Sequence, residues 1–162
     1  MSGGSAHVRL EMRSDPTYLA GARQLVLGVA QRLGLDEQAC GQVALAVDEA
    51  LANVIRHGYD RAPDRPIWLS IWPLAPEGGK GSGLRIVIED EARQVDPTQI
   101  RSRALDDLRP GGLGVHIIRE VMDEVSYERR EPMGMRVTMT KRSGADGSGP
   151  GESGYARSEA RP

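Results

Sequence analysis

The order of the expected elements predicts an α+β fold, a two-layer sandwich with helices on one face of a mostly antiparallel sheet. Alternating apolar and polar residues mark half-buried strands, and apolar residues at helical spacing mark amphipathic helices. Together they give the order β-α-α-β-β-loop-α-β-β. Because strands and helices come in pairs, this order argues against a Rossmann sheet. The chain also contains no G-x-x-x-x-G-K-[ST] phosphate loop.

The first three elements have clear local signals. A strand is expected over residues 7–13, where apolar and charged residues alternate. A helix is expected from the Asp-Pro pair at 15–16 to Gly34, because aspartate caps a helix start, proline fits its first turn and glycine ends it. Asp36 is expected to cap a second helix that runs to Gly58.

The remaining elements alternate between regular segments and turns. Two strands are expected at 67–72 and 84–89, joined by a flexible Gly- and Pro-rich hairpin loop at 73–83. The charged segment 91–110 is expected to be a loop with a short helix. The remaining expected elements are an amphipathic helix after the glycines at 111–114 and a closing hairpin of strands 124–129 and 135–141.

Composition favours one cytoplasmic domain. The domain is expected over residues 7–142, between a flexible N-terminus (1–6) and a disordered Gly- and Ser-rich tail (143–162). A net charge of −2, from 21 basic and 23 acidic residues, argues against direct nucleic-acid binding. No apolar run is long enough to span a membrane, and no signal peptide is recognisable. Cys40 is the single cysteine, which excludes internal disulfides and cysteine-based zinc sites.

A polar stripe on the second expected helix is the first candidate site. Glu49, Asn53 and His57 are spaced i, i+4 and i+8, so on an α-helix they lie in one row. A carboxylate, a carboxamide and an imidazole in a row can serve as a base, a metal ligand and a polar orienter. The alternative is a solvated helix face, and the stripe alone favours neither interpretation.

Two later segments offer further chemistry. Asp90 stands where a strand ends, so its carboxylate can accept a hydrogen bond from an exocyclic amine such as that of adenine; the alternative is an ordinary turn aspartate. The glycines at 111–114 open a helix, where free N–H groups and close backbone approach favour phosphate. The alternative for this segment is a tight connection between two elements.

Taken together, the three segments resemble a known nucleotide-binding fold. An E-x-x-x-N helix, a strand-terminal Asp and a G-x-G helix entry occur in this order in the Bergerat fold of histidine-kinase-like ATPases. The closer resemblance is to the anti-sigma factor serine/threonine kinases, a small single-domain branch. It rests on D-E-A-L-A-N-V-I-R-H-G-Y at 48–59 and R-P-G-G-L-G-V-H-I-I-R at 109–119, followed by M-D-E-V at 122–125, and covers roughly residues 7–142.

The resemblance implies a role for individual residues. Asn53 matches the asparagine that coordinates Mg²⁺ at the phosphates, and Glu49 matches the glutamate that acts as general base. Asp90 matches the aspartate that holds the adenine amine. Further residues of the expected ATP pocket are His57, Ala92, Arg109, Gly112, Leu113, Gly114 and Val115. Of these, Arg109 is a candidate for the γ-phosphate or the protein partner, and His57 is expected to support the helix end.

The chain departs from the family pattern on the adenine side. Ala92 and Gln94 replace the two glycines of the D-x-G-x-G segment, and Met135 replaces the threonine of the last strand. The bulk of Gln94 is expected to reshape the adenine pocket, and the three replacements predict weaker ATP binding.

The resemblance also implies partners. It suggests an ATP- and Mg²⁺-dependent kinase that phosphorylates a serine of a STAS-type anti-anti-sigma factor and sequesters a sigma factor. A homodimer is compatible with it. The alternative is a non-catalytic binding module gated by nucleotide, which the departures favour, whereas Glu49 favours the kinase because binding alone needs no base.

Overall fold

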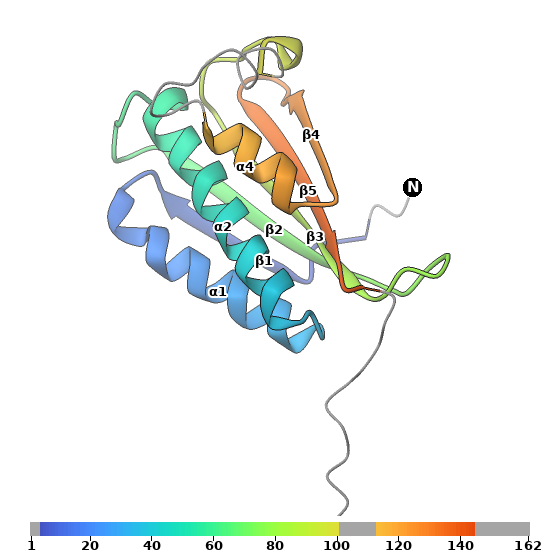
Figure 1. Cartoon of the computed structure of the whole chain (residues 1–162). Helices are drawn as coiled ribbons and strands as arrows, with labels where there is room; N and C mark the ends of the chain where they lie inside the picture. The colour runs from blue at the N-terminus through green and yellow to red at the C-terminus, as the bar shows by residue number, and fades with distance from the viewer. Residues whose placement is uncertain (1–3, 101–112, 145–162) are drawn as a thin grey trace, which may run out of the picture.

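The computed structural model describes residues 4–100 and 113–144. Helices α1 and α2 follow the first strand, α4 precedes the last two strands, and all three lie on one face of a five-stranded sheet (Figure 1). The strands are β1 (Val8–Arg13), β2 (Pro66–Leu74), β3 (Gly83–Asp90), β4 (Glu124–Arg129) and β5 (Met135–Arg142). The helices are α1 (Leu19–Arg32), α2 (Glu37–Asn53) and α4 (Leu113–Val121), with a 3₁₀ turn η1 (Pro16–Tyr18) and a π-helical turn η2 (Val54–Gly58).

The strand order is β1-β2-β3-β5-β4, and every neighbouring pair is antiparallel. This confirms the predicted α+β sandwich. Strand β5 lies between β3 and β4, so the last strand of the chain pairs with the middle one. In this register Glu89 is opposite Arg136, which places the end of β3 beside the start of β5.

A single hydrophobic core fills the space between the helices and the sheet. Its central helix is α2, which packs against α1 on one side and α4 on the other (Figure 1). The predicted alternation on the strands matches this burial, since residues of β2 and β3 that face the helices are inaccessible to solvent. The fully buried large side chains include Val43, Val47 and Leu51 from α2, and Ile67, Leu69, Leu84 and Ile86 from the sheet.

Both predicted helix caps are present, but one opens a different helix type. Asp36 Oδ1 accepts a hydrogen bond from the N–H of Ala39 (2.8 Å) and starts α2 as expected. Asp15 Oδ1 accepts one from the N–H of Thr17 (2.9 Å), yet the turn that follows is 3₁₀, and the α-helix begins only at Leu19.

The second helix ends at Gly58 as predicted, but its last turn is π-helical. The α-helix stops at Asn53 and continues as the π-turn η2, in which the N–H of Tyr59 bonds to the carbonyl of Val54 (2.9 Å). The Tyr59 hydroxyl donates to the carbonyl oxygen of Pro66 (2.6 Å) and accepts from the N–H of Glu91 (2.7 Å). This tyrosine therefore ties the widened turn to β2 and to the end of β3, contacts that local periodicity does not encode.

The hairpin between β2 and β3 is longer than predicted. Both strands extend into the expected loop, to Leu74 and from Gly83. Gly83 is required there because a Cβ would overlap the carbonyl oxygen of Lys141 on β5. Asp90 is the last residue of β3, and residues 97–100 are helical.

Candidate functional site

The start of α4 lies directly against the polar stripe of α2. A Cβ built on Gly114 would lie 2.7 Å from Glu49 Oε2 and 3.2 Å from Asn53 Oδ1. A methyl group on this glycine would therefore force the side chains of Glu49 and Asn53 to move aside. The structure thus brings together two of the three motif segments, the glycine-rich helix entry and the polar stripe.

Glu49 and Asn53 are half-buried on α2. Within residues 4–100 and 113–144, neither side chain forms a hydrogen bond or an ion pair. Asp48, their neighbour, is instead paired with Arg23 of α1 (Nη1 to Oδ2, 2.6 Å). A carboxylate and a carboxamide without protein partners, on one side of a rigid helix, are free to act on a ligand.

Asp90 is buried at the end of β3, with only 4% of its surface exposed. Its Oδ1 accepts hydrogen bonds from the N–H groups of Ala92 (2.8 Å) and Met135 (3.1 Å). Burial raises the pKa of this carboxyl above its ordinary value, although the two N–H groups and the nearby Arg130 oppose the rise. No described residue donates to Oδ2, so one oxygen of a held carboxylate remains available to an amine.

The turn η2 joins the two halves of the site. Gly58, at its end, packs against Ala92, since a Cβ on Gly58 would lie 3.0 Å from the Cβ of Ala92. The Tyr59 hydroxyl meets the N–H of Glu91. A continuous series of contacts therefore runs from Gly114 through α2 and η2 to the turn that follows Asp90.

The matches to known proteins fit this arrangement. The sequence matches the family described as histidine kinase-like ATPase domain over residues 12–141. The chain belongs to this family. It is also similar to proteins named serine-protein kinase RsbW, which confirms the resemblance drawn from the motifs.

Three of these relatives illustrate the similarity. RsbW of Bacillus subtilis (strain 168) is 26% identical over 149 residues, which cover 87% of this chain and 88% of the relative. RsbW of Halalkalibacterium halodurans is 26% identical over 142 residues, covering 83% and 82% of the two chains. RsbW of Listeria monocytogenes serotype 4a (strain HCC23) is 27% identical over 137 residues, covering 83% and 85%.

The family motif contains glycines at the positions of Ala92 and Gln94, and the structure accommodates the replacements. Neither residue has the positive φ that favours glycine. The amide of Gln94 donates from Nε2 to the carbonyl oxygen of Arg130 (2.7 Å), on the turn between β4 and β5. Met135, in place of the family's threonine, still offers its backbone N–H to Asp90.

The other predicted pocket residues form no contact that assigns them a role, or lie outside the described residues. His57 is exposed at the end of η2 and forms no hydrogen bond or ion pair within the described residues. Leu113 is 48% exposed and Val115 is half-buried at the start of α4. Arg109 and Gly112 lie outside the residues that the structure describes.

Sequence reasoning did not single out Tyr59, Arg130 or Arg23 as contributors to this region. Each acts through a partner that is distant along the chain, and no spacing pattern marks such pairs. The tyrosine that directly follows the stripe motif was the one available hint, because a large aromatic residue with a hydroxyl at a helix end usually has a partner when buried.

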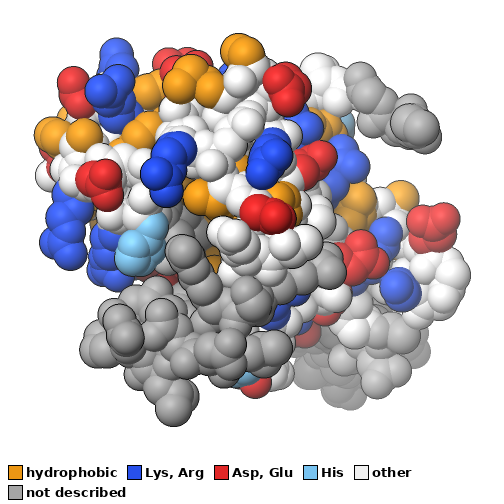
Figure 2. All heavy atoms as spheres, turned by 90° about the horizontal axis from the view of Figure 1, so that it is seen from above, with side chains coloured by type: hydrophobic (Ala, Val, Ile, Leu, Met, Phe, Trp, Pro, Cys, Tyr) orange, Lys and Arg blue, Asp and Glu red, His pale blue; other side chains and the backbone are white. Residues whose placement is uncertain are grey.

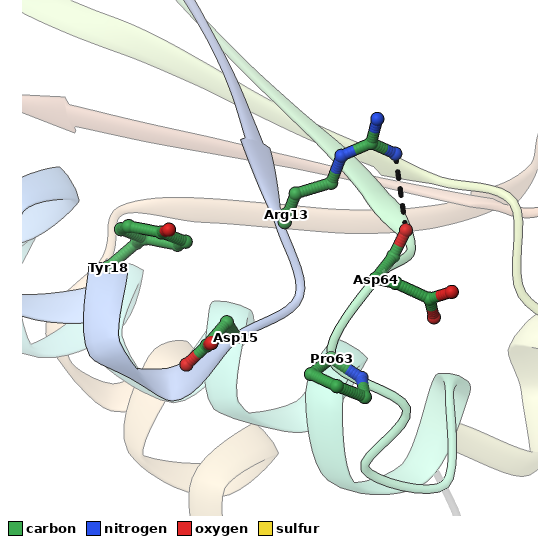
Figure 3. Close-up of a pocket in the computed structure, with 5 residues that line it drawn as sticks. All are labelled: Arg13, Asp15, Tyr18, Pro63 and Asp64. Carbon is green, nitrogen blue, oxygen red and sulfur yellow. Dashed lines mark hydrogen bonds between the residues drawn. The ribbon is translucent and has the colours of Figure 1, made fainter.

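A separate hollow of about 450 Å³ lies away from these residues (Figure 3). It is open to solvent and lined by Arg13, Asp15, Tyr18, Pro63 and Asp64. Within it, Arg13 Nη1 donates to the carbonyl oxygen of Asp64 (3.1 Å), as the dashed line shows. None of the motif residues that the structure describes lines this hollow, so it is not the candidate site.

Basic, acidic and hydrophobic side chains are interspersed over the face that Figure 2 shows. Among the described helices, none is long and apolar enough to cross a membrane.

Proposed function

We propose that this protein is an ATP-dependent protein-serine kinase that phosphorylates an anti-anti-sigma factor and sequesters a sigma factor. The main support is the close approach of the Gly114 backbone to Glu49 and Asn53. Family membership and the RsbW relatives, which are named serine-protein kinases, support ATP as the phosphoryl donor. Both regulatory partners are inferred from the resemblance to anti-sigma factor kinases.

Each residue of the site has a role in phosphoryl transfer. Bound ATP supplies the γ-phosphoryl group, which moves to a seryl oxygen of the partner while ADP leaves. Glu49 accepts the proton of that seryl hydroxyl. Asp90 orients the adenine ring of ATP through its free carboxylate oxygen. Gly114 lets the phosphates approach the start of α4. Transfer of this kind needs mainly positioning and charge stabilisation, so these few groups suffice.

Asn53 would hold a magnesium ion in this proposal. Its carboxamide oxygen is a ligand type that Mg²⁺ accepts, and it has no hydrogen-bond partner among residues 4–100 and 113–144. In the described part of the chain, no cluster of three or more His, Cys, Asp or Glu side chains offers a complete metal site. Mg²⁺ usually binds through one or two protein ligands together with water and substrate phosphates, so a site of this kind does not require such a cluster.

The alternative is a non-catalytic module in which nucleotide gates the binding of a protein partner. It is favoured by Ala92 and Gln94, which replace two glycines on the adenine side. Glu49 weighs against it, because its carboxylate, unpaired among the described residues, lies beside the glycine at the helix entry, and binding alone needs no general base.

The two functions are separated by a Glu49→Gln variant. We expect phosphate transfer to fall by roughly 10²–10⁴-fold, because the base is lost, while ATP affinity stays nearly unchanged. The measurement combines calorimetric ATP titrations, with and without Mg²⁺, with transfer of radiolabelled phosphate to purified anti-anti-sigma domains. Glu37→Gln, an exposed change in the first turn of the same helix, is the matched control and should transfer normally.

Two results would count against the proposal. Wild-type protein that shows no ATP binding at millimolar nucleotide would overturn both functions. The binding module would be established instead if wild type and Glu49→Gln both bound ATP tightly, both changed their affinity for the partner on binding it, and neither transferred phosphate.

A further inference from the structure

Two loops that are distant in sequence meet around Asp90. One is the turn after β3, from Asp90 to Gln94, and the other is the β4–β5 turn, from Arg130 to Gly134. Gln94 Nε2 donates to the carbonyl oxygen of Arg130 (2.7 Å), and the N–H of Met135 donates to Asp90 Oδ1 (3.1 Å). Gly134 has φ +96°, and a Cβ there would overlap the carbonyl oxygen of Asp90. The two turns therefore pack backbone to backbone at this aspartate.

Arg130 strengthens the same junction through its side chain. Its Nη1 reaches the carbonyl oxygen of Asp90 (3.5 Å) and lies 3.6 Å from Glu91 Oε1. Its Nε lies 3.6 Å from Glu89 Oε1, and its guanidinium stacks 4.8 Å from the ring centroid of Trp68. One half-buried cation thus contacts the two carboxylates that flank Asp90, which reduces repulsion within this run of three acidic residues.

The Gln94 bond is specific to this chain's departure from the family motif. A glycine at position 94 would have no side chain with which to bond the opposite turn. The donated N–H adds a directional contact between two loops that also meet at the Asp90 carboxylate, at the Arg130 side chain and at Gly134. Loss of this bond would loosen the two turns relative to each other, and with them the Met135 N–H that helps to hold the Asp90 carboxylate.

We propose that Gln94 and Arg130 form a clasp, the Gln94–Arg130 clasp, that positions the free oxygen of Asp90 toward the exocyclic amine of a bound adenine base. Both are positioning residues that act through Asp90 and do not touch the reacting atoms. The inference rests on the proposed ATP site. It gives Gln94, whose bulk was expected to reshape the adenine pocket, a supporting role in that pocket.

The test uses Gln94→Glu, which keeps the size of the side chain and removes its N–H donor. Affinities for ATP and inosine triphosphate are measured by calorimetry, since inosine carries a carbonyl where adenine carries its amine. Wild type is expected to bind ATP about tenfold more tightly than inosine triphosphate. In the variant this affinity ratio is expected to fall about fivefold, the usual effect of one hydrogen bond. Gln94→Ala should change the preference in the same direction.

A matched control and a nucleotide-free measurement complete the test. Gln38→Glu adds the same charge at an exposed position in the first turn of α2, at the end of this helix away from Asn53. It should leave the preference for ATP unchanged. In the absence of nucleotide, amide hydrogen exchange of Met135 should be faster in Gln94→Glu than in wild type, because its bond to Asp90 depends on the clasp.

Each remaining outcome is decisive. An unchanged ATP preference in both Gln94 variants, or an equal loss of affinity for the two nucleotides, overturns the positioning role. Wild-type protein that binds neither nucleotide overturns the proposed function and the adenine role together, while the exchange rate of Met135 still decides whether the clasp exists. Unchanged exchange at Met135 overturns the clasp itself.

Discussion

The buried carboxylate of Asp90 lowers the stability of the folded protein at neutral pH. Burial raises the pKa of its side chain, so the charged form is disfavoured in the folded protein relative to the unfolded chain. The unfolded state then binds fewer protons than the folded state between the ordinary pKa of 3.8 and the raised one. Stability is therefore lowered as pH rises from the ordinary pKa through the raised one.

An Asp90→Asn variant tests this cost. The new Oδ1 can still accept from Ala92 and Met135, while the buried charge is gone. We expect the free energy of unfolding at pH 7 to rise by about 1 kcal/mol, a usual gain when a costly functional group is neutralised. Urea unfolding at pH 7 and in acid should show the gain shrinking as pH falls, because protonation of Asp90 removes the same buried charge. A variant less stable than wild type at pH 7 would contradict this account.

At the junction of α2 and α4, the backbone of Gly114 lies against the side chains of Glu49 and Asn53. A methyl group added to Gly114 would have to displace the Glu49 carboxylate. By contrast, a Cβ on Gly28 in α1 would meet nothing within 4 Å. The two helical glycines therefore differ in what an added methyl group does, although alanine has the higher helix propensity at either position.

Gly114→Ala and Gly28→Ala form a matched pair. The first should displace Glu49 and lower phosphate transfer by about 100-fold, a usual effect of misplacing a catalytic group by about 1 Å, without destabilising the fold. The second should raise the free energy of unfolding by about 1 kcal/mol and leave transfer unchanged. Parallel transfer assays and thermal unfolding measure both effects. Equal transfer rates for the two variants would show that the α2–α4 spacing does not set the position of Glu49.

The molecule as a whole is organised around one core rather than two. The buried cluster draws residues from α1, α2, α4 and strands β1, β2, β3 and β5. Strand β4 adds partly buried side chains that pack against it. The sheet face opposite the helices carries both tryptophans of the chain, Trp68 and Trp72, each stacked under an arginine. Fluorescence of these residues therefore reports on the sheet, and far-ultraviolet circular dichroism reports mainly on the helices.

A shared core predicts one cooperative unfolding transition. Leu51→Ala, in the fully buried centre of α2, should lower the free energy of unfolding by about 2–5 kcal/mol. Leu45→Ala, on the same helix at 43% exposure, should change it by less than about 0.5 kcal/mol. Fluorescence and circular dichroism should give coincident transitions in both variants. Separate transitions would show that the helices and the sheet unfold independently.

Much of the fold was predictable because its signals are local. Alternation located the strands to within a few residues, and Asp36 marked the start of α2 through its own capping bond. The predicted end of this helix at Gly58 is also where its helical structure stops, but the sequence did not indicate the π-turn there, which Tyr59 ties to Pro66 and Glu91. The proposed domain limits at 7 and 142 stay a prediction, and the expected tail beyond residue 144 lies outside the described residues.

The sequence by itself determined which residues are candidates for the site: Glu49 and Asn53 by their spacing, and Asp90 by its place at a strand end. Only the tertiary structure decided how they meet. The placement of β5 between β3 and β4 brings Met135 to Asp90, and the packing of α4 on α2 brings Gly114 to Glu49. The physical reason is that periodicity and capping act within a few residues, whereas pairings between distant segments are selected by packing of the whole core.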